Sequence, residues 1–356
     1  MKGLLKGYYW YKNLGDEILL LGVINRIFEN YKLDKLDISC GDHLRLRRRV
    51  DRNKDLIWDN FDKLDYVAHK KFGYEFGYDI KFFGWWEVLT EQRTFPHNGY
   101  NLLIGEAPTV LMGKYVILWW IWTPTKFKTK ALYRSILPFA DKIVVREKKS
   151  FEIAQKYNKN TVLHNDFAYD IFQKIKIDTK KEESAKLFVN INQHIYNETA
   201  TRKIMDVVYE NRDSKLEKYY VPCDMEDDAK IYHELKVKID DLKYYNWTRY
   251  TVKEILEFFA TADLGVGARL HFLLLLHWLG KKTEPLFYQE KINKFFDDKP
   301  EDKKDEPQKQ EKNKNNEEME KDVEKKLQEQ KDKTPTDEEK TIDKTAENKD
   351  QDKVEK

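Results

Sequence analysis

Short continuous apolar runs recur along the first part of the chain, and longer helix-like segments separate them. The runs have the length of strands and occupy residues 101–105, 114–119, 142–145 and 161–163, and residues 36–40 are a further short strand-like stretch. Strands covered on both faces read as unbroken apolar runs, so the pattern predicts a buried and mostly parallel sheet. The alternation of strands with helices predicts an α/β fold.

The same alternation starts again after a connector rich in lysine and glutamate. Predicted strands occupy residues 187–192, 219–222, 264–266 and 283–288, and predicted helices occupy residues 197–212, 227–237 and 252–261. Thr251 is placed to cap the last of these helices. We therefore expect an N-terminal domain at residues 1–177, a linker at 178–186 and a C-terminal domain at 187–297.

Residues 298–356 differ in composition from the rest of the chain. Lysine, glutamate, aspartate, glutamine and asparagine dominate there, and no aromatic residue occurs. Such a segment cannot bury enough apolar surface to offset the entropy lost on ordering. We predict a disordered charged tail without a catalytic role.

The charge balance and the cysteines argue against several functional classes. The 356 residues include 65 Lys+Arg and 63 Asp+Glu, and the formal net charge of +2 gives no basic excess for nucleic acid. Cys40 and Cys223 are far apart and indicate neither a disulfide framework nor a zinc site. We expect no nucleic-acid partner, and a protein of a reducing compartment.

The apolar runs are too short for a membrane protein. The N-terminus lacks the apolar core of a signal peptide, and the runs at 115–122 and 272–279 are shorter than the ~18–20 residues of a membrane span. We expect a cytoplasmic protein that at most makes peripheral contact with the inner face of the membrane.

Two N-terminal stretches give weaker signals. Residues 60–100 are rich in Phe, Tyr, Trp and Gly without a clear period, so we expect helices and loops there. Four arginines between residues 45 and 49 form a small basic cluster. We expect them on a solvated helix face, and contact with a phosphate or a membrane surface is the alternative.

One stretch of the second half combines a cation with a titratable side chain. Gly265 and Gly267 interrupt an apolar run, and Arg269 and His271 follow before an apolar segment of helix length. This order predicts a strand, a tight turn and a helix start. Ligands of α/β sheets bind at the carboxyl ends of strands, and helix N-termini favour anions. The stretch indicates anion binding beside an acid or base. The alternative is an arginine paired with a carboxylate and a histidine within the core.

A second candidate lies near the N-terminus. The residues after Asn13 are almost continuously apolar, as in a buried helix, and Asp16 and Glu17 fall in its first turn, where the helix dipole favours carboxylates. Gly15 permits a tight backbone turn at this point. On these residues alone the simplest interpretation is a helix cap.

Several blocks of the chain together resemble the polysaccharide pyruvyl transferase family. They occur in the order of the family's motifs and lie between residues 3 and 297. The blocks are Gly7-Tyr8-Tyr9, Asn13-Leu14-Gly15-Asp16-Glu17, Val144-Val145-Arg146-Glu147-Lys148-Lys149-Ser150, His164-Asn165-Asp166, Val221-Pro222-Cys223-Asp224 with Asp228, Arg269-Leu270-His271 and Tyr288-Gln289-Glu290-Lys291. Each block is short, and their joint order and spacing make the resemblance specific.

The resemblance implies a glycosyltransferase-B-like fold, in which two Rossmann-like domains face a cleft, without a metal requirement. It also implies a transferase that moves pyruvate from phosphoenolpyruvate onto a saccharide, commonly as a cyclic ketal. The acceptor would belong to a cell-surface polymer such as the cell wall, or to its precursor, including a lipid-linked one. Phosphoenolpyruvate is the donor substrate in this prediction, and no cofactor is expected.

The family motifs imply how the donor is held. Phosphoenolpyruvate carries a carboxylate and a phosphate close together, and arginine binds both groups bidentately. By analogy with the family, Arg146 and Arg269 hold the donor, and Lys291 adds a further positive charge. Asn13 is assigned to the substrate site on the same grounds.

The motifs also imply two catalytic residues. His271 would act as the general acid that protonates the enol methylene of the donor. Protonation builds oxocarbenium character at the central carbon, which a sugar hydroxyl attacks as phosphate leaves. Asp16 would orient or deprotonate that hydroxyl.

The chain departs from the family pattern in its N-terminal half. Trp10 stands at a position usually held by glycine, and residues 105–108 and 122–125 replace glycine-rich turns. These changes concern acceptor recognition and activity. Two further hypotheses therefore stay open: a nucleotide-sugar glycosyltransferase of similar fold, and a catalytically degenerate member that binds a saccharide or a partner.

Overall fold

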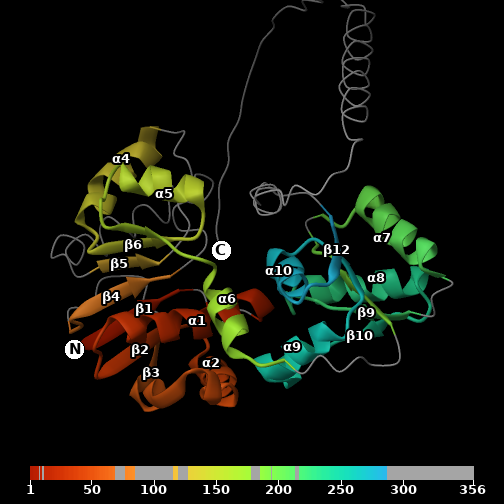
Figure 1. Cartoon of the computed structure of the whole chain (residues 1–356), viewed down its shortest axis with the longest axis horizontal. Coiled ribbons are helices and arrows are strands. Elements are labelled where there is room, and N and C mark those ends of the chain that lie inside the picture. Colours follow the sequence, from red (N-terminus) through yellow and green to blue (C-terminus); the bar gives the residue numbers. More distant parts are fainter. Residues whose placement is uncertain are drawn as a thin grey trace, which may run out of the picture. The chain divides into compact units, whose positions relative to one another are not determined.

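Two parallel sheets organise the part of the chain that the computed structural model describes (Figure 1), which is residues 1–7, 9, 12–68, 77–84, 115–118, 127–177, 185–193, 195–212 and 216–286. In the order in which they pair, the strands of the first sheet are β3 (Leu64–Ala68), β2 (Lys35–Cys40), β1 (Lys2–Lys6), β4 (Ile80–Phe83), β5 (Tyr115–Leu118), β6 (Lys142–Val145) and β7 (Thr161–Leu163). Those of the second are β10 (Lys243–Tyr244), β9 (Glu217–Tyr220), β8 (Lys186–Asn190), β11 (Leu264–Gly267) and β12 (Lys282–Pro285). The predicted α/β class with parallel sheets is confirmed.

Helices connect these strands. They are α1 (Leu14–Asn30), α2 (His43–Arg52), α4 (Phe127–Ile136), α5 (Lys148–Gln155), α6 (Phe167–Lys174), α7 (Glu198–Glu210), α8 (Ile231–Lys238), α9 (Val252–Ala260) and α10 (Leu270–Trp278). Both sheets belong to one compact unit, Met1–Asp298.

Each sheet has a point where its strand order reverses. The chain builds outward from β1 to β3 and then returns to place β4 on the other side of β1. In the second sheet β8 and β11 are the corresponding neighbours. Ligands of open α/β sheets bind outside the carboxyl ends of the strands at such points. The segments after β1 and β11, which lead into α1 and α10, are therefore the expected site.

Helix α1 forms as its sequence predicts. Asn13 caps it, because the side-chain Oδ1 accepts hydrogen bonds from the backbone N–H groups of Gly15 and Asp16 at 3.0 and 3.4 Å. Most of the helix is buried, in a core that it shares with β1, β2 and α6. Gly22 allows α6 to approach closely, since a Cβ there would overlap the carbonyl group of Phe167.

The predicted strand and helix around Arg269 are also confirmed, as β11 and α10. The glycines, however, do not form a tight turn. Gly265 and Gly267 lie inside the strand, where an added Cβ would overlap Leu276 and Phe272 of α10. Their role is to let the helix pack directly on the strand. Gly280 ends α10 with a φ of 68°, a conformation that favours glycine.

Some local predictions were wrong. The stretch at 60–100 contributes the strands β3 and β4. The sequence also predicts Ser150 as the cap of a helix at residues 151–157, but α5 already begins at Lys148 and Ser150 is buried within it. The predicted strand at 101–105, both altered turns, nearly all of the linker and the whole tail lie outside the described residues.

The basic cluster on α2 is not simply a solvated face. Arg49 is buried, and its Nε donates to Glu17 Oε2 at 2.6 Å. Its Nη1 donates to the carbonyl oxygens of Thr248 and Tyr250 at 2.8 and 3.1 Å. Arg45 completes the cluster with a contact of 3.2 Å to Glu17 Oε1. Helix α2 thus links the first turn of α1 to the loop that leads into α9.

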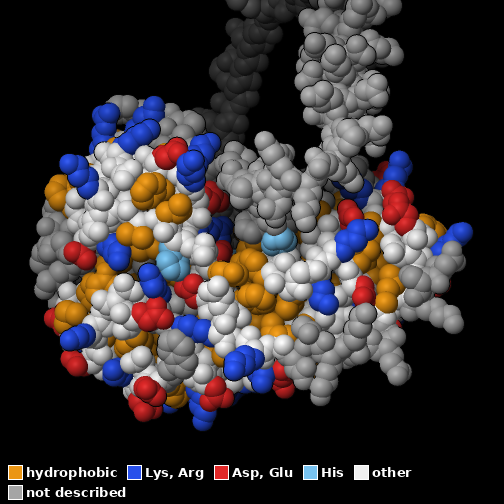
Figure 2. Space-filling view, in the orientation of Figure 1, with side chains coloured by type: hydrophobic (Ala, Val, Ile, Leu, Met, Phe, Trp, Pro, Cys, Tyr) orange, Lys and Arg blue, Asp and Glu red, His pale blue; other side chains and the backbone are white. Residues whose placement is uncertain are grey.

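Within the described ranges, no helix is long and apolar enough to cross a bilayer. On the face drawn in Figure 2, positive and negative side chains are interspersed.

Candidate functional site

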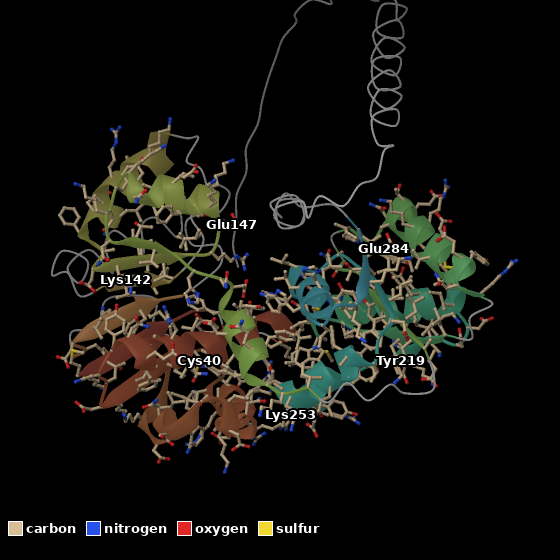
Figure 3. The ribbon with its side chains drawn as sticks, in the orientation of Figure 1. Cys40, Lys142, Glu147, Tyr219, Lys253 and Glu284 are labelled. Atoms are coloured by element: carbon tan, nitrogen blue, oxygen red, sulfur yellow. The ribbon has the colours of Figure 1, made fainter. Side chains whose placement is uncertain are left out.

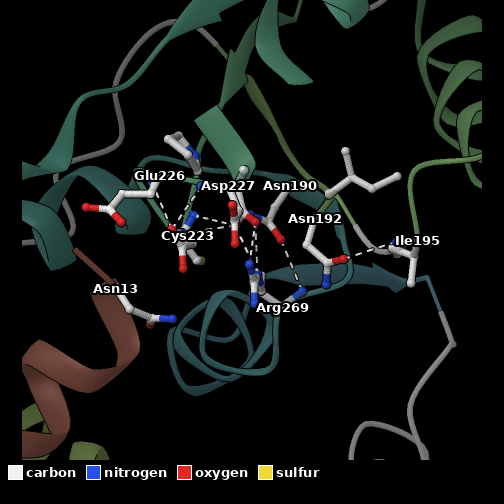
Figure 4. Close-up of polar contacts among 12 residues, drawn as sticks. Asn13, Asn190, Asn192, Ile195, Cys223, Glu226, Asp227 and Arg269 are labelled. Atoms are coloured by element: carbon white, nitrogen blue, oxygen red, sulfur yellow. Dashed lines mark hydrogen bonds and ion pairs between the residues drawn. The ribbon is translucent and has the colours of Figure 1, made fainter. Parts of the chain in front are cut away.

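Arg269 is fixed by a buried carboxylate at the end of β11. Its Nε lies 3.2 and 3.0 Å from the two oxygens of Asp228, and its Nη2 lies 2.5 Å from Oδ1 (Figure 4). Asp228 is fully buried and also accepts hydrogen bonds from the backbone N–H groups of Cys223 and Asp224. Burial raises the pKa of Asp228, and the Arg269 guanidinium opposes this shift. The guanidinium therefore has one defined orientation.

The neighbouring strand holds the backbone of the same residue. Asn190, at the end of β8, accepts the backbone N–H of Arg269 at 3.1 Å and donates to the carbonyl of Val221 at 2.7 Å. Both partners of this buried amide are backbone groups. It ties the ends of β8, β9 and β11 together at the point where the strand order reverses.

Arg146 and Asp166 meet at the carboxyl edge of the first sheet. Arg146 directly follows β6. Figure 3 labels Lys142 at the start of this strand and Glu147, the residue after Arg146. Asp166 follows β7 and caps α6, and Arg146 Nη1 donates to its Oδ2 at 2.5 Å. A pocket at this edge is lined by Leu19, Val144, Val145, Arg146, His164, Asn165, Asp166 and Phe167.

The ring of His271, in the first turn of α10, lies against Asp166 and Gly15. Its Nε2 is 3.6 Å from Asp166 Oδ2, and its Nδ1 faces Gly15 in the first turn of α1. A Cβ on Gly15 would overlap the imidazole ring. Three separate motifs of the sequence, around residues 15, 166 and 271, therefore converge on one ring.

The electrostatics of this cluster centre on Asp166. Burial alone raises the pKa of its carboxyl, but the charge of Arg146 and the contact with His271 outweigh burial, and the pKa lies below its usual value. A hydrogen bond from the backbone N–H of Ala168 acts in the same direction. Asp166 is therefore a carboxylate in the folded protein at neutral pH.

The N-terminal signature contacts the segment that follows β9 of the second sheet. The backbone N–H of Leu14 donates to the carbonyl of Cys223 at 2.8 Å, and Asn13 forms an isolated antiparallel bridge with Asp224. Asp16 is half-buried in the first turn of α1. Burial, and next the Asp16 carboxylate, raise the pKa of Tyr9.

The structure brings most of the predicted site residues together. Arg146 and His271 share a contact with Asp166, and Arg269 lies two positions before His271. Asn13 and Asp16 lie two positions before and one position after Gly15, the glycine that packs against the ring. Lys291 lies outside the described residues. The sequence prediction assigned no role to the two carboxylates that hold the arginines. The only sequence signal for Asp166 and Asp228 was that both stand in blocks resembling the family motifs.

We expect Gly15→Ala to disturb this site, because the new Cβ would displace the His271 ring. Overpacking of this kind costs about 1–3 kcal/mol of folding free energy, and we expect the turnover of any reaction that uses His271 to fall by more than the stability alone explains. Gly77→Ala is the matched control, since a Cβ there meets nothing within 4 Å. Equal thermal unfolding temperatures and equal activities for the two variants would contradict this role of Gly15.

The architecture places the chain in a known structural class. It is similar to UDP-GlcNAc 2-epimerase from Neisseria meningitidis bound to UDP-GlcNAc, with a TM-score of 0.53, 10% identity, and coverage of 81% of this chain and 83% of that one. It is also similar to UDP-N-acetylglucosamine 2-epimerase from Rickettsia bellii, with a TM-score of 0.51, 10% identity and coverage of 80% and 78%. At such identities the likeness shows the fold alone, which is glycosyltransferase-B-like, as predicted.

Sequence comparison then gives the family. The polysaccharide pyruvyl transferase family model matches residues 13–275, so the chain belongs to this family of transferases. No curated protein matches the chain in sequence. The matched residues include α1 with its cap Asn13, the Arg146 and Asp166 segments, and the start of α10.

Proposed function

We propose that this protein transfers pyruvate from phosphoenolpyruvate to a saccharide of a cell-surface polymer or of its precursor, including a lipid-linked one. The observation that carries the proposal is the Asp166 carboxylate, which lies against both Arg146 and His271. An anion-binding cation and a group able to transfer a proton are thereby set side by side, which is the combination that an enol phosphate donor requires. The proposal assigns no cofactor.

The donor would be held by fixed cations. The guanidinium of Arg269 is oriented by Asp228 and that of Arg146 by Asp166, and both arginines follow strands at the carboxyl edge of a sheet. Because each arginine already has a carboxylate partner, the two ion pairs together carry almost no net charge. A donor with several negative charges therefore needs further positive charge, and Lys291 is proposed to supply it.

Proton transfer would start the reaction. His271 gives its proton to the methylene carbon of the donor, and the electrons of the carbon–carbon double bond form the new C–H bond. The central carbon gains oxocarbenium character, a sugar hydroxyl attacks it, and Asp16 takes up or orients the hydroxyl proton. Phosphate leaves with the electron pair of its C–O bond. A second hydroxyl of the same sugar then attacks the resulting oxocarbenium carbon and gives its proton to the deprotonated His271 ring, which closes the ketal.

Calorimetric titration of phosphoenolpyruvate into the full chain tests the donor assignment. We expect saturable binding by the wild type, and at least about tenfold weaker binding by Arg269→Lys, because lysine keeps the charge but loses the planar fork. Lysine is chosen over alanine because it leaves the fully buried Asp228 with a positive partner. Arg202→Lys, on the exposed face of α7, is the matched control and should bind as the wild type does.

UDP-N-acetylglucosamine serves as the competing ligand in the same experiment. The structures of similar fold include a UDP-GlcNAc complex, so saturable binding of this nucleotide sugar without binding of phosphoenolpyruvate would favour the nucleotide-sugar alternative. Binding of phosphoenolpyruvate that Arg269→Lys does not weaken would reject the assigned donor contact.

A further inference from the structure

Asp166 makes three different contacts with one carboxylate. Its Oδ1 accepts the backbone N–H of Ala168 at 3.0 Å and so caps α6. Its Oδ2 accepts the hydrogen bond from Arg146 and also lies 3.6 Å from His271 Nε2. The side chain is only 8% exposed. A carboxylate with this many partners can redistribute its interactions without leaving its place.

The imidazole of His271 packs against Gly15, but its Nε2 makes no hydrogen bond within the described residues. This atom is buried and has no hydrogen-bond partner among the described residues, since 3.6 Å exceeds hydrogen-bond length. The other ring nitrogen, Nδ1, lies against Gly15. A buried nitrogen without a partner is costly, so a small movement of the Asp166 carboxylate toward it is favourable. Nε2 is therefore the ring nitrogen that the Asp166 carboxylate approaches.

We infer that Asp166 is a positioning residue that couples donor binding at Arg146 to the proton on His271 Nε2. The inference rests on the proposed function. When an anionic donor engages Arg146, it competes with Asp166 for the guanidinium, and the carboxylate then turns its charge toward Nε2. An ionised carboxylate favours the protonated imidazole and fixes its orientation. His271 is thereby protonated, and so able to act as an acid, when the donor is bound.

The charged groups around the ring support this direction of coupling. Asp166 approaches from α6 and Arg146 from the end of β6, Asp16 follows Gly15 in α1, and Arg269 precedes the ring on its own segment. Arg269 is bound bidentately by Asp228, because its Nε donates to Oδ2 and its Nη2 donates to Oδ1. Asp166 is thus the carboxylate that approaches Nε2 most closely among the described ion pairs.

Asp166→Asn is the test, because asparagine keeps the helix cap and removes the charge. We expect phosphoenolpyruvate to bind at least as tightly as to the wild type, since Arg146 loses its competitor, while the turnover number falls at least about tenfold. A merely structural role would weaken both. Nuclear magnetic resonance of histidine-ring ¹⁵N in the full chain, assigned with His271→Gln, should show the ring shifting toward its charged form on donor addition only when Asp166 is present.

Asp170→Asn is the matched control, because this carboxylate lies one turn further along α6 and contacts His164 at 3.8 Å. It should respond as the wild type. If the His271 ring of the Asp166→Asn variant responds to the donor as the wild-type ring does, the inference is overturned and the proposed function stays intact. If the wild type does not bind phosphoenolpyruvate, the proposed function fails, and a pH titration of the ligand-free ring decides the inference. Equal titration curves for wild type and Asp166→Asn would then overturn it.

Discussion

Replacing His271 by glutamine should lower the rate of pyruvyl transfer by about 10²–10⁴-fold, the range typical for the loss of a general acid. Glutamine has a similar length and polar atoms at its end, but it cannot donate a proton to carbon. The expected loss is in the turnover number. Binding of phosphoenolpyruvate should be nearly unchanged, because the proposed donor contacts are the guanidinium groups of Arg146 and Arg269.

The measurement is phosphate release from phosphoenolpyruvate in the presence of saccharides that carry two neighbouring free hydroxyls, with mass spectrometry of the product. His233→Gln is the matched control, since His233 is exposed on α8 and makes an edge-to-face ring contact with Tyr232. Turnover by His271→Gln within a factor of two of the control would show that another group is the acid. Loss of donor binding in His271→Gln would instead assign the ring to binding.

Elements with strong local signals could be predicted from the sequence. Asn13 caps α1, Thr251 and Glu254 form a capping box on α9, and β11 leads into α10. In each case the residues that decide the structure lie within a few positions of one another. Strands β3 and β4 were missed, because their segment has no clear apolar period and no residue of β3 is fully buried.

The site could be predicted only as a set of separate residues. Motif resemblance pointed to Arg146, Arg269 and His271, and the structure adds the contacts among them. Nothing local in the sequence says that Asp166 lies between Arg146 and His271, because this contact depends on how two sheets bring their carboxyl edges together. The reason for glycine at position 15 is likewise a distant neighbour in the sequence, the His271 ring of α10.

The basic cluster of α2 shows the same limit, although a signal was present. Leu46 and Val50 are the buried apolar residues of this helix, and Arg49 falls on their side of it at helical spacing. An arginine that continues an apolar stripe is expected to meet a buried partner. The predicted solvated face holds for Arg47 and Arg48, which are exposed.

Replacing Glu17 by leucine should lower the free energy of unfolding by about 3–5 kcal/mol, because it leaves the buried Arg49 guanidinium without its carboxylate. The guanidinium already holds the carbonyl oxygens of Thr248 and Tyr250, and it lies 5.4 Å from the ring of Trp247. It cannot turn to solvent without breaking these contacts. Urea unfolding gives the change as a shift in midpoint at constant slope.

The double variant Glu17→Leu/Arg49→Met separates the charge effect from packing. Replacing both members of a buried ion pair by apolar residues is often neutral, so the double variant should recover most of the stability that Glu17→Leu loses. Glu29→Leu is the matched control, because its partners Arg26 and Lys174 are partly exposed and such pairs contribute about 0–1 kcal/mol. A Glu17→Leu loss no larger than that of the control would show that α2 does not hold the first turn of α1 in place. A double variant as unstable as Glu17→Leu would instead assign the stability to the contacts of Arg49 with the loop before α9.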